Sequence, residues 1–587
     1  MRTLRLTQGR LFRLALAQVN PTVGDLDGNS RKTIQFIEEA RALGADLVAF
    51  PEMIIPGYPA EDLLFKPSFI QDNIEAMRKV VAASRDIAVV VGFVDADSDI
   101  YNAAAVAYRG ELAGVYHKMY LPTYGVFDED RYFKRGNVCP VYIINGVGVG
   151  VNICEDIWYP VGPIAVQRDA GAEVIVNING SPFHAGKRSY RERMIATRAA
   201  DNELFVAYLN TVGGQDELVF DGGSLIFDQA GDLVARGKEF QEELVVADLD
   251  IDAVFRSRLR DPRPRKENPA LLREIGTAEV IHVSEYHHVE KPPLPSKGDV
   301  QLLDPIGEVY SALVLGTRDY VRKSGFRKVI IGLSGGIDSS LTACIAVDAL
   351  GRENVLGVSM PSRYSSEGSV VDARVLASNL GIDLWTVPIE LAHGAFLDML
   401  DPYFRGTESD IAEENLQARI RGNILMAISN KFGWLVLSTG NKSEMATGYA
   451  TLYGDMAGGF AVLKDVRKTR VYELAHWRNA NGTPRDVIPK VILEKPPSPE
   501  LKPGHRTEAE RVPFRTMDPI LKAYVEEERS FEEIVATGFN PDIVKQVIQW
   551  VDRNEYKRRQ AAPGVKITPR AFGKDRRLPI VNRYRQF

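Results

Sequence analysis

Apolar and polar residues follow two alternating patterns along residues 11–255. Short apolar runs rich in β-branched residues, such as LFRLALAQV, IAVVVGFV, VGVGVNIC and AEVIVNING, have the length and composition of strands. Between them, segments such as SRKTIQFIEEARALG and KRSYRERMIATRAADNE place apolar residues three or four positions apart, which predicts amphipathic helices. We therefore predict an α/β domain with a large sheet over residues 11–255.

The pattern weakens over residues 256–300 and then resumes. The stretches RSRLRDPRPRKENP and EYHHVEKPPLPSKGD combine charge and proline without clear periodicity, which is typical of a linker. From 301 to 587, apolar strands such as KVIIGL, NVLGVSM, LWTVPI and WLVLST are separated by helical segments. This order predicts a doubly wound parallel sheet with both faces covered, and ligands at the carboxyl ends of its strands.

Length, composition and charge agree with two or more domains. The chain has 587 residues, 45% of them hydrophobic and 26% charged, with a net charge of -6, which excludes a disordered or fibrous protein. A negative net charge argues against a general nucleic-acid binder. The N-terminal residues lack a signal-peptide pattern and no apolar run approaches the length of a membrane span, so we expect no membrane association.

The cysteines Cys139, Cys154 and Cys344 are odd in number and include no close pair. They therefore offer neither a disulfide framework nor a CxxC zinc site, and they indicate a reducing compartment. We expect a cytoplasmic location.

Three predicted strands of the first domain end at a residue whose side chain can act as an acid, a base or a nucleophile: Glu52 in ADLVAFPE, Lys118 in GVYHK and Cys154 in GVNICEDIW. Taken alone, each has a plain explanation, because a lone cysteine is usually a buried small residue and a lone Glu or Lys is usually solvated. Together they provide a nucleophile, a base for its proton and a cation for an oxyanion, which are the requirements for attack on an amide.

The segments FPE, HKMYLPTYGVFDE and NICEDIW resemble the three signatures of the nitrilase, or carbon-nitrogen hydrolase, superfamily. The resemblance implies a four-layer α-β-β-α sandwich. It also implies that Glu52 is the general base, that Cys154 forms a thioester and that Lys118 stabilises the oxyanion. Glu129 matches a second acidic residue near the lysine, although DED could equally be a plain acidic turn.

Glutaminases of that superfamily hold their substrate at positions that match Tyr124, Ser181 and Lys187 of this chain. The resemblance therefore implies that these three residues bind glutamine. The plain alternative for Lys187 is a solvated loop charge.

A second candidate site lies in RKVIIGLSGGIDSSLTACIAVDALG, between a strand and a helix. Two glycines, several hydroxyls and free helix N-terminal amides would form a cradle for an anion. The segment lacks the GK[ST] of a Walker A loop. Asp338 within the cradle would repel phosphate unless a cation such as Mg²⁺ lay between them. A bare SGG could also be a turn followed by a helix cap.

The full SGGIDSS resembles the pyrophosphate loop of the N-type ATP pyrophosphatases, which adenylylate a substrate oxygen and release pyrophosphate. ENLQARIRGN, LVLSTGNKSEMATGYATLYGD, EKPPSPELKPG and RNEYKRRQAAPGVKITPRAFG resemble signatures of the NAD synthetase family. This resemblance implies that Mg²⁺ binds Asp338 and Glu444, that deamido-NAD⁺ contacts Asn415, Glu444 and Lys557, and that ATP contacts Gly332, Leu333, Ser334, Gly335, Gly336, Ile337, Asp338, Ser339, Ser340, Thr439 and Lys468. The plain alternatives are a polar helix face for ENLQARIRGN and a solvated helix end for EYKRRQ.

Together, the two resemblances imply an ATP-dependent carbon-nitrogen ligase. It would hydrolyse glutamine in the first domain and use the ammonia to amidate adenylylated deamido-NAD⁺ in the second. ATP and Mg²⁺ would be required, with no tightly bound organic cofactor and no nucleic-acid or membrane partner, and similarity suggests a homo-oligomer. Another ATP-dependent glutamine amidotransferase and a catalytically dead nucleotide-sensing scaffold are the alternatives; the joint presence of Glu52, Lys118, Cys154 and Asp338 argues against the scaffold.

Overall fold

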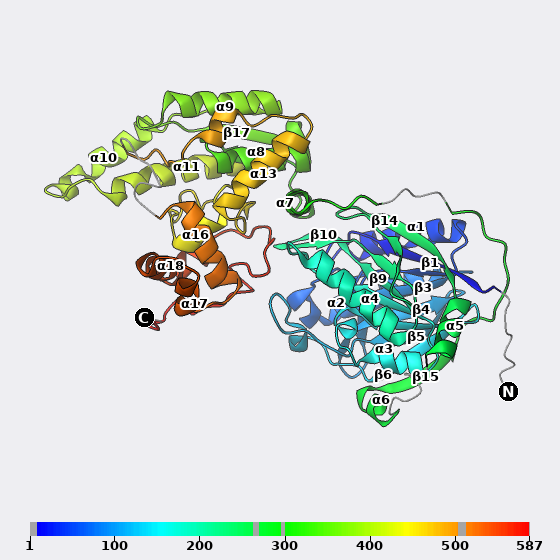
Figure 1. The fold of residues 1–587 in the computed structure, drawn as a ribbon. Coiled ribbons are helices and arrows are strands. Elements are labelled where there is room, and N and C mark those ends of the chain that lie inside the picture. The colour runs from blue at the N-terminus through cyan, green and yellow to red at the C-terminus, as the bar shows by residue number, and fades with distance from the viewer. Residues whose placement is uncertain (1–8, 262–268, 295–299, 503–511, 586) are drawn as a thin grey trace. The chain divides into compact units, whose positions relative to one another are not determined.

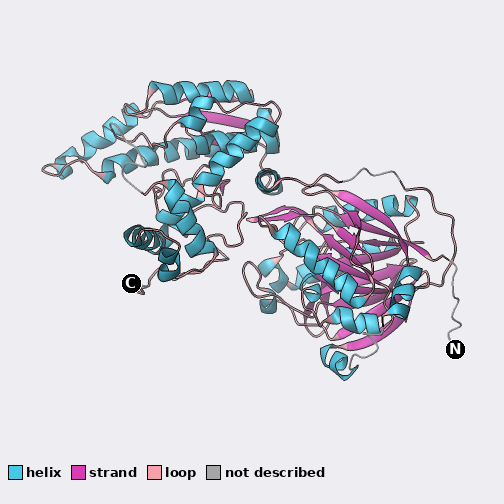
Figure 2. Cartoon of the chain, in the orientation of Figure 1, coloured by secondary structure: helices cyan, strands magenta, loops and turns pink. Residues whose placement is uncertain are grey.

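The computed structural model describes residues 9–261, 269–294, 300–502, 512–585 and 587. The chain divides into an N-terminal unit, Met1–Gln215 with Phe220–Leu302, and a C-terminal unit, Asp216–Val219 with Leu303–Phe587 (Figure 1). Strands predominate in the N-terminal unit and helices in the C-terminal unit (Figure 2).

Two large sheets form the centre of the N-terminal unit. The six-stranded sheet has the order β14-β1-β2-β3-β4-β5, formed by Glu243–Asp250, Leu11–Gln18, Leu47–Ala49, Ala88–Ala96, Ile100–Tyr108 and Glu111–His117. The seven-stranded sheet has the order β13-β12-β9-β8-β7-β6-β15, formed by Leu233–Arg236, Leu225–Phe227, Phe205–Asn210, Val174–Asn179, Val147–Ile153, Val138–Ile144 and Thr277–His282. A separate hairpin pairs β10 (Val212–Gln215) with β11 (Leu218–Asp221).

The two sheets pack face to face, and helices cover their outer faces. Along β1, Leu14 and Leu16 belong to a core cluster shared with the other sheet, whereas Ala15 and Ala17 belong to a cluster shared with helices. This alternation is expected because successive side chains of a strand point to opposite faces. Helices α1 (Leu26–Ala42) and α2 (Pro67–Ala82) cover one outer face, and α3 (Pro163–Asp169) and α4 (Lys187–Asn202) cover the other. The predicted α-β-β-α sandwich is confirmed.

Part of the segment predicted as a linker is regular structure. Its described residues include most of α5 (Asp252–Arg260), α6 (Pro269–Ile275) and β15, which pairs in parallel with β6 at the edge of the sheet. Residues 262–268 and 295–299 of the predicted linker lie outside the described residues.

The C-terminal unit contains a five-stranded sheet in the order β18-β17-β16-β19-β20. Its strands are Asp383–Thr386, Val355–Ser359, Val329–Gly332, Leu435–Ser438 and Phe460–Ala461, and every adjacent pair is parallel. The strand order reverses beside β16, from which the chain first proceeds to β17 and later returns to β19. The predicted doubly wound sheet is confirmed, and ligands of such sheets bind at the carboxyl ends of the strands beside this reversal.

Helices pack against both faces of this sheet. Ile330 of β16 packs with Ile420 and Leu425 of α11 on one face of the sheet. The adjacent strand residues Val329 and Ile331 are also buried and point to the opposite face, where α8 packs. The helices associated with the sheet are α7 (Pro305–Lys323), α8 (Ile337–Leu350), α9 (Glu367–Leu380), α10 (Glu390–Phe404), α11 (Ile411–Phe432), α12 (Lys442–Thr447), α13 (Lys468–Asn481) and α14 (Lys490–Glu494).

A group of helices near the C-terminus has its own apolar cluster. It comprises α16 (Phe514–Leu521), a π-helical turn η6 (Lys522–Glu526), α17 (Phe531–Ala536), α18 (Pro541–Arg553) and α19 (Glu555–Arg558). Helix α12 packs against α16 and α18. Short 3₁₀ helices elsewhere are η1 (Glu61–Phe65), η2 (Glu129–Arg131), η3 (Cys154–Ile157) and η5 (Arg352–Asn354). Within the described residues, no helix has both the length and the apolar character needed to cross a membrane.

Candidate active sites

Glu52, Lys118 and Glu129 form a buried cluster of charges in the N-terminal unit. Lys118 directly follows β5, and its Nζ lies 2.7 Å from Glu52 Oε1 and 2.8 and 2.9 Å from the two carboxylate oxygens of Glu129. Burial lowers the pKa of Lys118, but the charges of Glu129 and Glu52 outweigh burial and raise it well above its ordinary value. Lys118 is therefore a permanent cation in this cluster.

Residues that the sequence did not indicate hold these carboxylates in place. The Asn102 amide donates to Glu52 Oε1 at 2.6 Å, and the Gly180 backbone N–H donates to Glu52 Oε2 at 2.7 Å. The Tyr58 hydroxyl donates to Glu129 Oε1 at 2.9 Å. These hydrogen bonds fix the orientation of both carboxylates around the lysine.

Cys154 stands at a strained turn where β7 ends and η3 begins. Its φ of 46° is in the left-handed region, which non-glycine residues adopt rarely and mostly at functional sites. The residue is only 3% exposed, but the charged groups around it include Glu52, Lys118 and Glu129. Burial raises the pKa of the thiol well above its ordinary value, Glu52 raises it further, and Lys118 partly opposes them. The thiol therefore needs a base before it can attack.

Asp156 connects the end of β5 to the turn that carries the cysteine. Its carboxylate accepts hydrogen bonds from the Tyr116 hydroxyl at 2.7 Å and from the backbone N–H groups of Met119, Tyr120 and Ile153 at 3.1, 2.9 and 3.0 Å. Burial raises the pKa of this carboxyl to about 6, although its hydrogen bonds lower it. The sequence analysis did not identify this role, although the position of an acid two residues after a strand-end cysteine could have indicated it.

The predicted glutamine-binding residues form two hydrogen-bonded pairs. The Tyr124 hydroxyl donates to Glu155 Oε2 at 2.9 Å, and Glu155 itself is mostly buried beside the cysteine. Lys187 Nζ donates to the Ser181 hydroxyl at 2.8 Å and to the Pro182 carbonyl at 2.7 Å. The first pair contributes an anion and the second a cation, which are complementary to the charges of an amino acid.

The glycine-rich loop of the C-terminal unit joins β16 to α8. Gly335 has φ of 78°, and a Cβ atom there would lie 2.2 Å from the Ser369 carbonyl oxygen, so this position requires glycine. Leu333 and Ile337 point into the core and are 2% and 4% exposed, so only their backbone groups are available to a ligand. Gly336 is the residue before the first turn of α8.

The serines of this loop hydrogen-bond within the loop. The Ser339 and Ser340 hydroxyls donate to the Gly336 carbonyl at 3.0 and 2.8 Å, and the Ser334 and Ser339 hydroxyl oxygens lie 3.2 Å apart. The Gly336 N–H donates to the Ser334 hydroxyl at 3.3 Å. These bonds fix the shape of the loop, which the sequence predicts to bind an anion.

Charged residues from three segments meet beside the loop. Lys468, the first residue of α13, forms an ion pair with Asp338 and lies 3.9 Å from Glu444 Oε1. Asn441, which the sequence did not indicate, donates to Asp338 Oδ1 at 2.9 Å and caps α12, where Glu444 completes the capping box. Thr439 is the residue directly after β19. Asp338, Glu444, Lys468 and Thr439 thus all lie at or near the carboxyl end of β16 or β19.

Asp338 and Glu444 form a pair suited to a magnesium ion. Burial and the negative charge of Asp338 raise the pKa of Glu444 to about 8, while Lys468 opposes them. A divalent cation would relieve this repulsion, and Mg²⁺ is typically held by one or two carboxylates together with substrate phosphates. The two side chains fit such an ion.

The other two residues predicted to contact the dinucleotide hold the segment after α12. The Asn415 side-chain oxygen accepts from the Thr451 hydroxyl at 2.7 Å. Lys557 Nζ donates to the Gly448 and Ala450 carbonyls, both at 2.8 Å. Both residues therefore contact the segment 448–451.

Comparison with known proteins agrees with this division of the chain. Residues 13–258 match the carbon-nitrogen hydrolase family, and residues 309–561 match the NAD synthase family. The chain is 50% identical to the glutamine-dependent NAD(+) synthetase of Thermotoga maritima over 580 residues, which cover 98% of this chain and 99% of that protein. The chain belongs to the glutamine-dependent NAD(+) synthetase family.

Further members of the NAD(+) synthetase family are similar to this chain over nearly its full length. The Aquifex aeolicus enzyme is 46% identical over 98% of this chain and all of its own length. The solved structure of the glutamine-dependent NAD⁺ synthetase from Acinetobacter baumannii, in complex with adenosine diphosphate, is 42% identical, with a TM-score of 0.72 over 98% of this chain and 99% of that chain. The family expected from the motifs is therefore confirmed.

Proposed function

We propose that the chain synthesises NAD⁺ from deamido-NAD⁺, ATP and ammonia that it releases from glutamine. The supporting observation is that one chain carries both the buried Glu52–Lys118–Cys154 group and the glycine-rich loop with Asp338. Its similarity to glutamine-dependent NAD(+) synthetases extends over 98% of its length.

In the N-terminal unit, Glu52 takes the proton of the Cys154 thiol as the sulfur attacks the side-chain amide of glutamine. The raised pKa of the thiol supports this role, because the sulfur must lose a proton before it can attack. Lys118 stabilises the oxyanion of the tetrahedral intermediate. Glu52 returns the proton to the amide nitrogen, ammonia leaves, and water activated by the deprotonated Glu52 hydrolyses the thioester to glutamate.

Four side chains around the cysteine bind the zwitterionic end of glutamine. Lys187, with Ser181, pairs with the substrate carboxylate, while Glu155, with Tyr124, pairs with its ammonium group. The hydrogen bond within each pair supports this assignment, because it pre-orients the charge that faces the substrate. Glu129 keeps Lys118 in position beside Glu52.

In the C-terminal unit, the carboxylate of deamido-NAD⁺ attacks the α-phosphate of ATP. Residues 332–340 bind the pyrophosphate through backbone N–H groups and hydroxyls, Thr439 contacts ATP, and Lys468 contacts its phosphates. When bound at Asp338 and Glu444, Mg²⁺ supplies charge neutralisation for the phosphates. Asn415, Glu444 and Lys557 contact deamido-NAD⁺, and ammonia displaces AMP to give NAD⁺. We also expect a homo-oligomer.

Substitutions in each site test whether the two half-reactions are separable. Cys154→Ala should abolish glutamine-dependent NAD⁺ formation and leave formation from added ammonium intact, because ammonium bypasses the thioester. Asp338→Ala should leave glutamine hydrolysis measurable and abolish NAD⁺ formation. Mass spectrometry of NAD⁺ together with a glutamate assay measures both reactions. A Cys154→Ala chain that forms no NAD⁺ from ammonium would contradict separable sites.

Substrate competition distinguishes the proposal from another amidotransferase activity. The chain should form NAD⁺ from deamido-NAD⁺ in the presence of xanthosine monophosphate or aspartate as competing acceptors. Amidation of either competitor in preference to deamido-NAD⁺ would contradict the assignment, and absence of glutamine hydrolysis would favour a catalytically dead scaffold.

A further inference from the structure

The first turn of α12 presents side chains in two directions. Asn441 and Glu444 are directed toward the glycine-rich loop, where Asn441 contacts Asp338 and Glu444 lies near Lys468. Lys442, between them in sequence, is instead buried in a cluster formed with η6 and the C-terminal segment. One helical turn therefore connects the ATP site to a part of the chain that the proposed reaction does not use.

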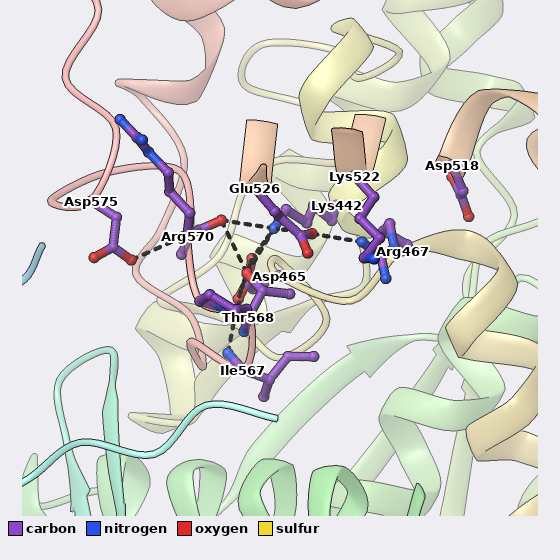
Figure 3. A network of polar contacts seen from close by, with 12 residues as sticks. Lys442, Asp465, Arg467, Asp518, Lys522, Glu526, Ile567, Thr568, Arg570 and Asp575 are labelled. Atoms are coloured by element: carbon purple, nitrogen blue, oxygen red, sulfur yellow. Dashed lines mark hydrogen bonds and ion pairs between the residues drawn. The ribbon is translucent and has the colours of Figure 1, made fainter. Parts of the chain in front are cut away.

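The ammonium group of Lys442 is buried and contacts four oxygen atoms. Its Nζ lies 2.8 Å from Asp465 Oδ1, 3.0 Å from Glu526 Oε1, 2.8 Å from the Thr568 hydroxyl and 2.9 Å from the Arg570 carbonyl (Figure 3). The side chains of Lys442, Asp465 and Glu526 are 2%, 3% and 6% exposed. Ions so deeply buried persist only when they are paired, so this geometry is tightly constrained.

Asp465 is the centre of the cluster. Besides Lys442, it accepts hydrogen bonds from the backbone N–H groups of Ile567 and Thr568 at 2.8 and 2.7 Å and from the Thr568 hydroxyl. Burial raises its pKa, but the charges of Lys442 and Lys566 outweigh burial, and the pKa is lowered. Asp465 is therefore an anion that joins α12 to the C-terminal segment.

The same cluster also fixes the start of α13, which carries Lys468. Asp465 lies three residues before Lys468, and the Lys442 backbone N–H donates to the Val466 carbonyl at 2.9 Å. The Lys468 N–H donates to the Ser443 hydroxyl at 2.9 Å, and that hydroxyl donates to Asp518 at 2.5 Å. The first turns of α12 and α13 are thus fixed to each other.

The π-helical turn η6 contributes Glu526, which also pairs with Arg467 at 2.7 Å. Single π-helical turns occur frequently at functional sites. Arg467 is the cap residue of α13, directly before Lys468. Glu526 therefore contacts residues adjacent to the ATP site from both α12 and α13.

We propose that Lys442 is a positioning residue for NAD⁺ synthesis. Its buried ammonium group, held by Asp465, Glu526 and the segment 568–570, sets the separation of Glu444 and Lys468 around the phosphates of ATP. The inference rests on the proposed function. It assigns to the C-terminal segment the role of holding in place the first turns of α12 and α13, which carry Glu444 and Lys468.

Lys442→Met in the full-length chain tests the proposal. We expect the kcat of ammonium-dependent NAD⁺ formation to fall about tenfold to a hundredfold with a raised KM for MgATP, because small displacements of catalytic groups have effects of that size. The KM for deamido-NAD⁺ should rise less than the KM for MgATP, since of its three proposed contacts only Glu444 lies on the displaced turn, whereas Asn415 and Lys557 contact residues 448–451. Glutamine hydrolysis in the N-terminal unit should be unchanged.

Arg478→Met is the matched control. Arg478 is also a buried cation and pairs with Asp348 at 2.6 Å, but these two residues lie near the ends of α13 and α8 that are opposite to Lys468 and Asp338. We expect this variant to lower the thermal unfolding temperature and to retain the KM for MgATP. Equal kinetic losses in both variants would overturn the proposal, as would wild-type kinetics in Lys442→Met.

Glu526→Gln provides a milder variant in case Lys442→Met does not fold. It keeps the Lys442–Asp465 pair and weakens the pairs that Glu526 of η6 forms with Lys442 and Arg467, so the KM for MgATP should rise, but less than in Lys442→Met. An unchanged KM for MgATP in folded Glu526→Gln, alongside an unfolded Lys442→Met chain, would overturn the proposal. A wild-type chain that forms no NAD⁺ from ammonium would instead overturn the proposed function.

Discussion

At the scale of single residues, the ionisation of the proposed nucleophile, Cys154, depends on burial and on the charged side chains around it. Cys154 has a positive φ, and its burial and the carboxylates around it disfavour a thiolate in the resting protein. Lys118 is the main opposing charge. The sulfur is therefore activated only when substrate and base act together, which limits its reactivity toward other compounds.

The raised pKa of Cys154 gives a testable pH dependence. The protonated thiol predominates below its pKa, and only the thiolate reacts with alkylating agents. Because the pKa lies well above the ordinary 9.0, we expect the rate of alkylation by iodoacetamide to rise with pH without reaching a plateau by pH 9. Mass spectrometry of the labelled peptide measures this rate, and a plateau near neutral pH would show a stabilised thiolate instead.

Cys154→Ala is the control for this measurement. The remaining cysteines, Cys139 and Cys344, are buried, and burial raises the pKa of each to about 12. We expect no labelling of the native variant on the time scale of the wild-type reaction. Rapid labelling of either residue would show that the native protein exposes them.

The sequence indicated the charged residues of both candidate sites better than it indicated the residues that hydrogen-bond to them. Glu52, Lys118 and Cys154 stand at strand ends, where reactive groups are conspicuous. Asn102 lies inside β4, and its amide reaches Glu52 only because the sheet brings β4 beside the site, 50 residues away in the chain. Partners of this kind are set by tertiary structure, and no local pattern indicates them.

At the scale of elements, burial determined which strands could be predicted. β1, β7 and β8 are apolar because both of their faces are covered, so their runs stand out in the sequence. β15 was missed because it lies at a sheet edge with mostly exposed residues, and within TAEVIH only Ile281 packs against the core. Its pairing with β6 depends on backbone hydrogen bonds, which the sequence pattern does not reveal.

The loop between β16 and α8 gives a prediction at this scale. Gly335→Ala should reduce ammonium-dependent NAD⁺ formation about tenfold or more, because a displaced loop misplaces the phosphates. The left-handed conformation costs about 1–2 kcal/mol for alanine, and the added Cβ would lie 2.2 Å from the Ser369 carbonyl. Steady-state kinetics with varied MgATP measure the effect.

Gly368→Ala is a control in a neighbouring segment. Gly368 lies in the first turn of α9, its φ is not positive, and the nearest atom to an added Cβ would be the Ser366 hydroxyl at 3.9 Å. We expect near-wild-type kinetics. If Gly335→Ala also kept wild-type kinetics, the glycine-rich loop would not be the phosphate-binding element.

At the scale of the whole molecule, each unit has its own apolar core, so damage to one site should leave the other unit folded. This independence should make the half-reactions separable by substitution.

Two separate reactions also raise a chemical requirement: ammonia released in the first reaction is mostly protonated in neutral water, and ammonium cannot attack an adenylylated carboxylate. Coupled synthesis therefore requires the nitrogen to reach the second site before it equilibrates with the solvent.

Isotope competition tests that requirement. With unlabelled glutamine and an excess of heavy-isotope ammonium in the buffer, we expect the amide of newly formed NAD⁺ to carry mainly the unlabelled nitrogen. The Cys154→Ala chain under the same conditions should incorporate only the heavy isotope, because it can draw only on the buffer. Mass spectrometry of NAD⁺ resolves the two products, and label incorporation in the wild-type chain that matches the composition of the bulk ammonium would show that the sites communicate only through solvent.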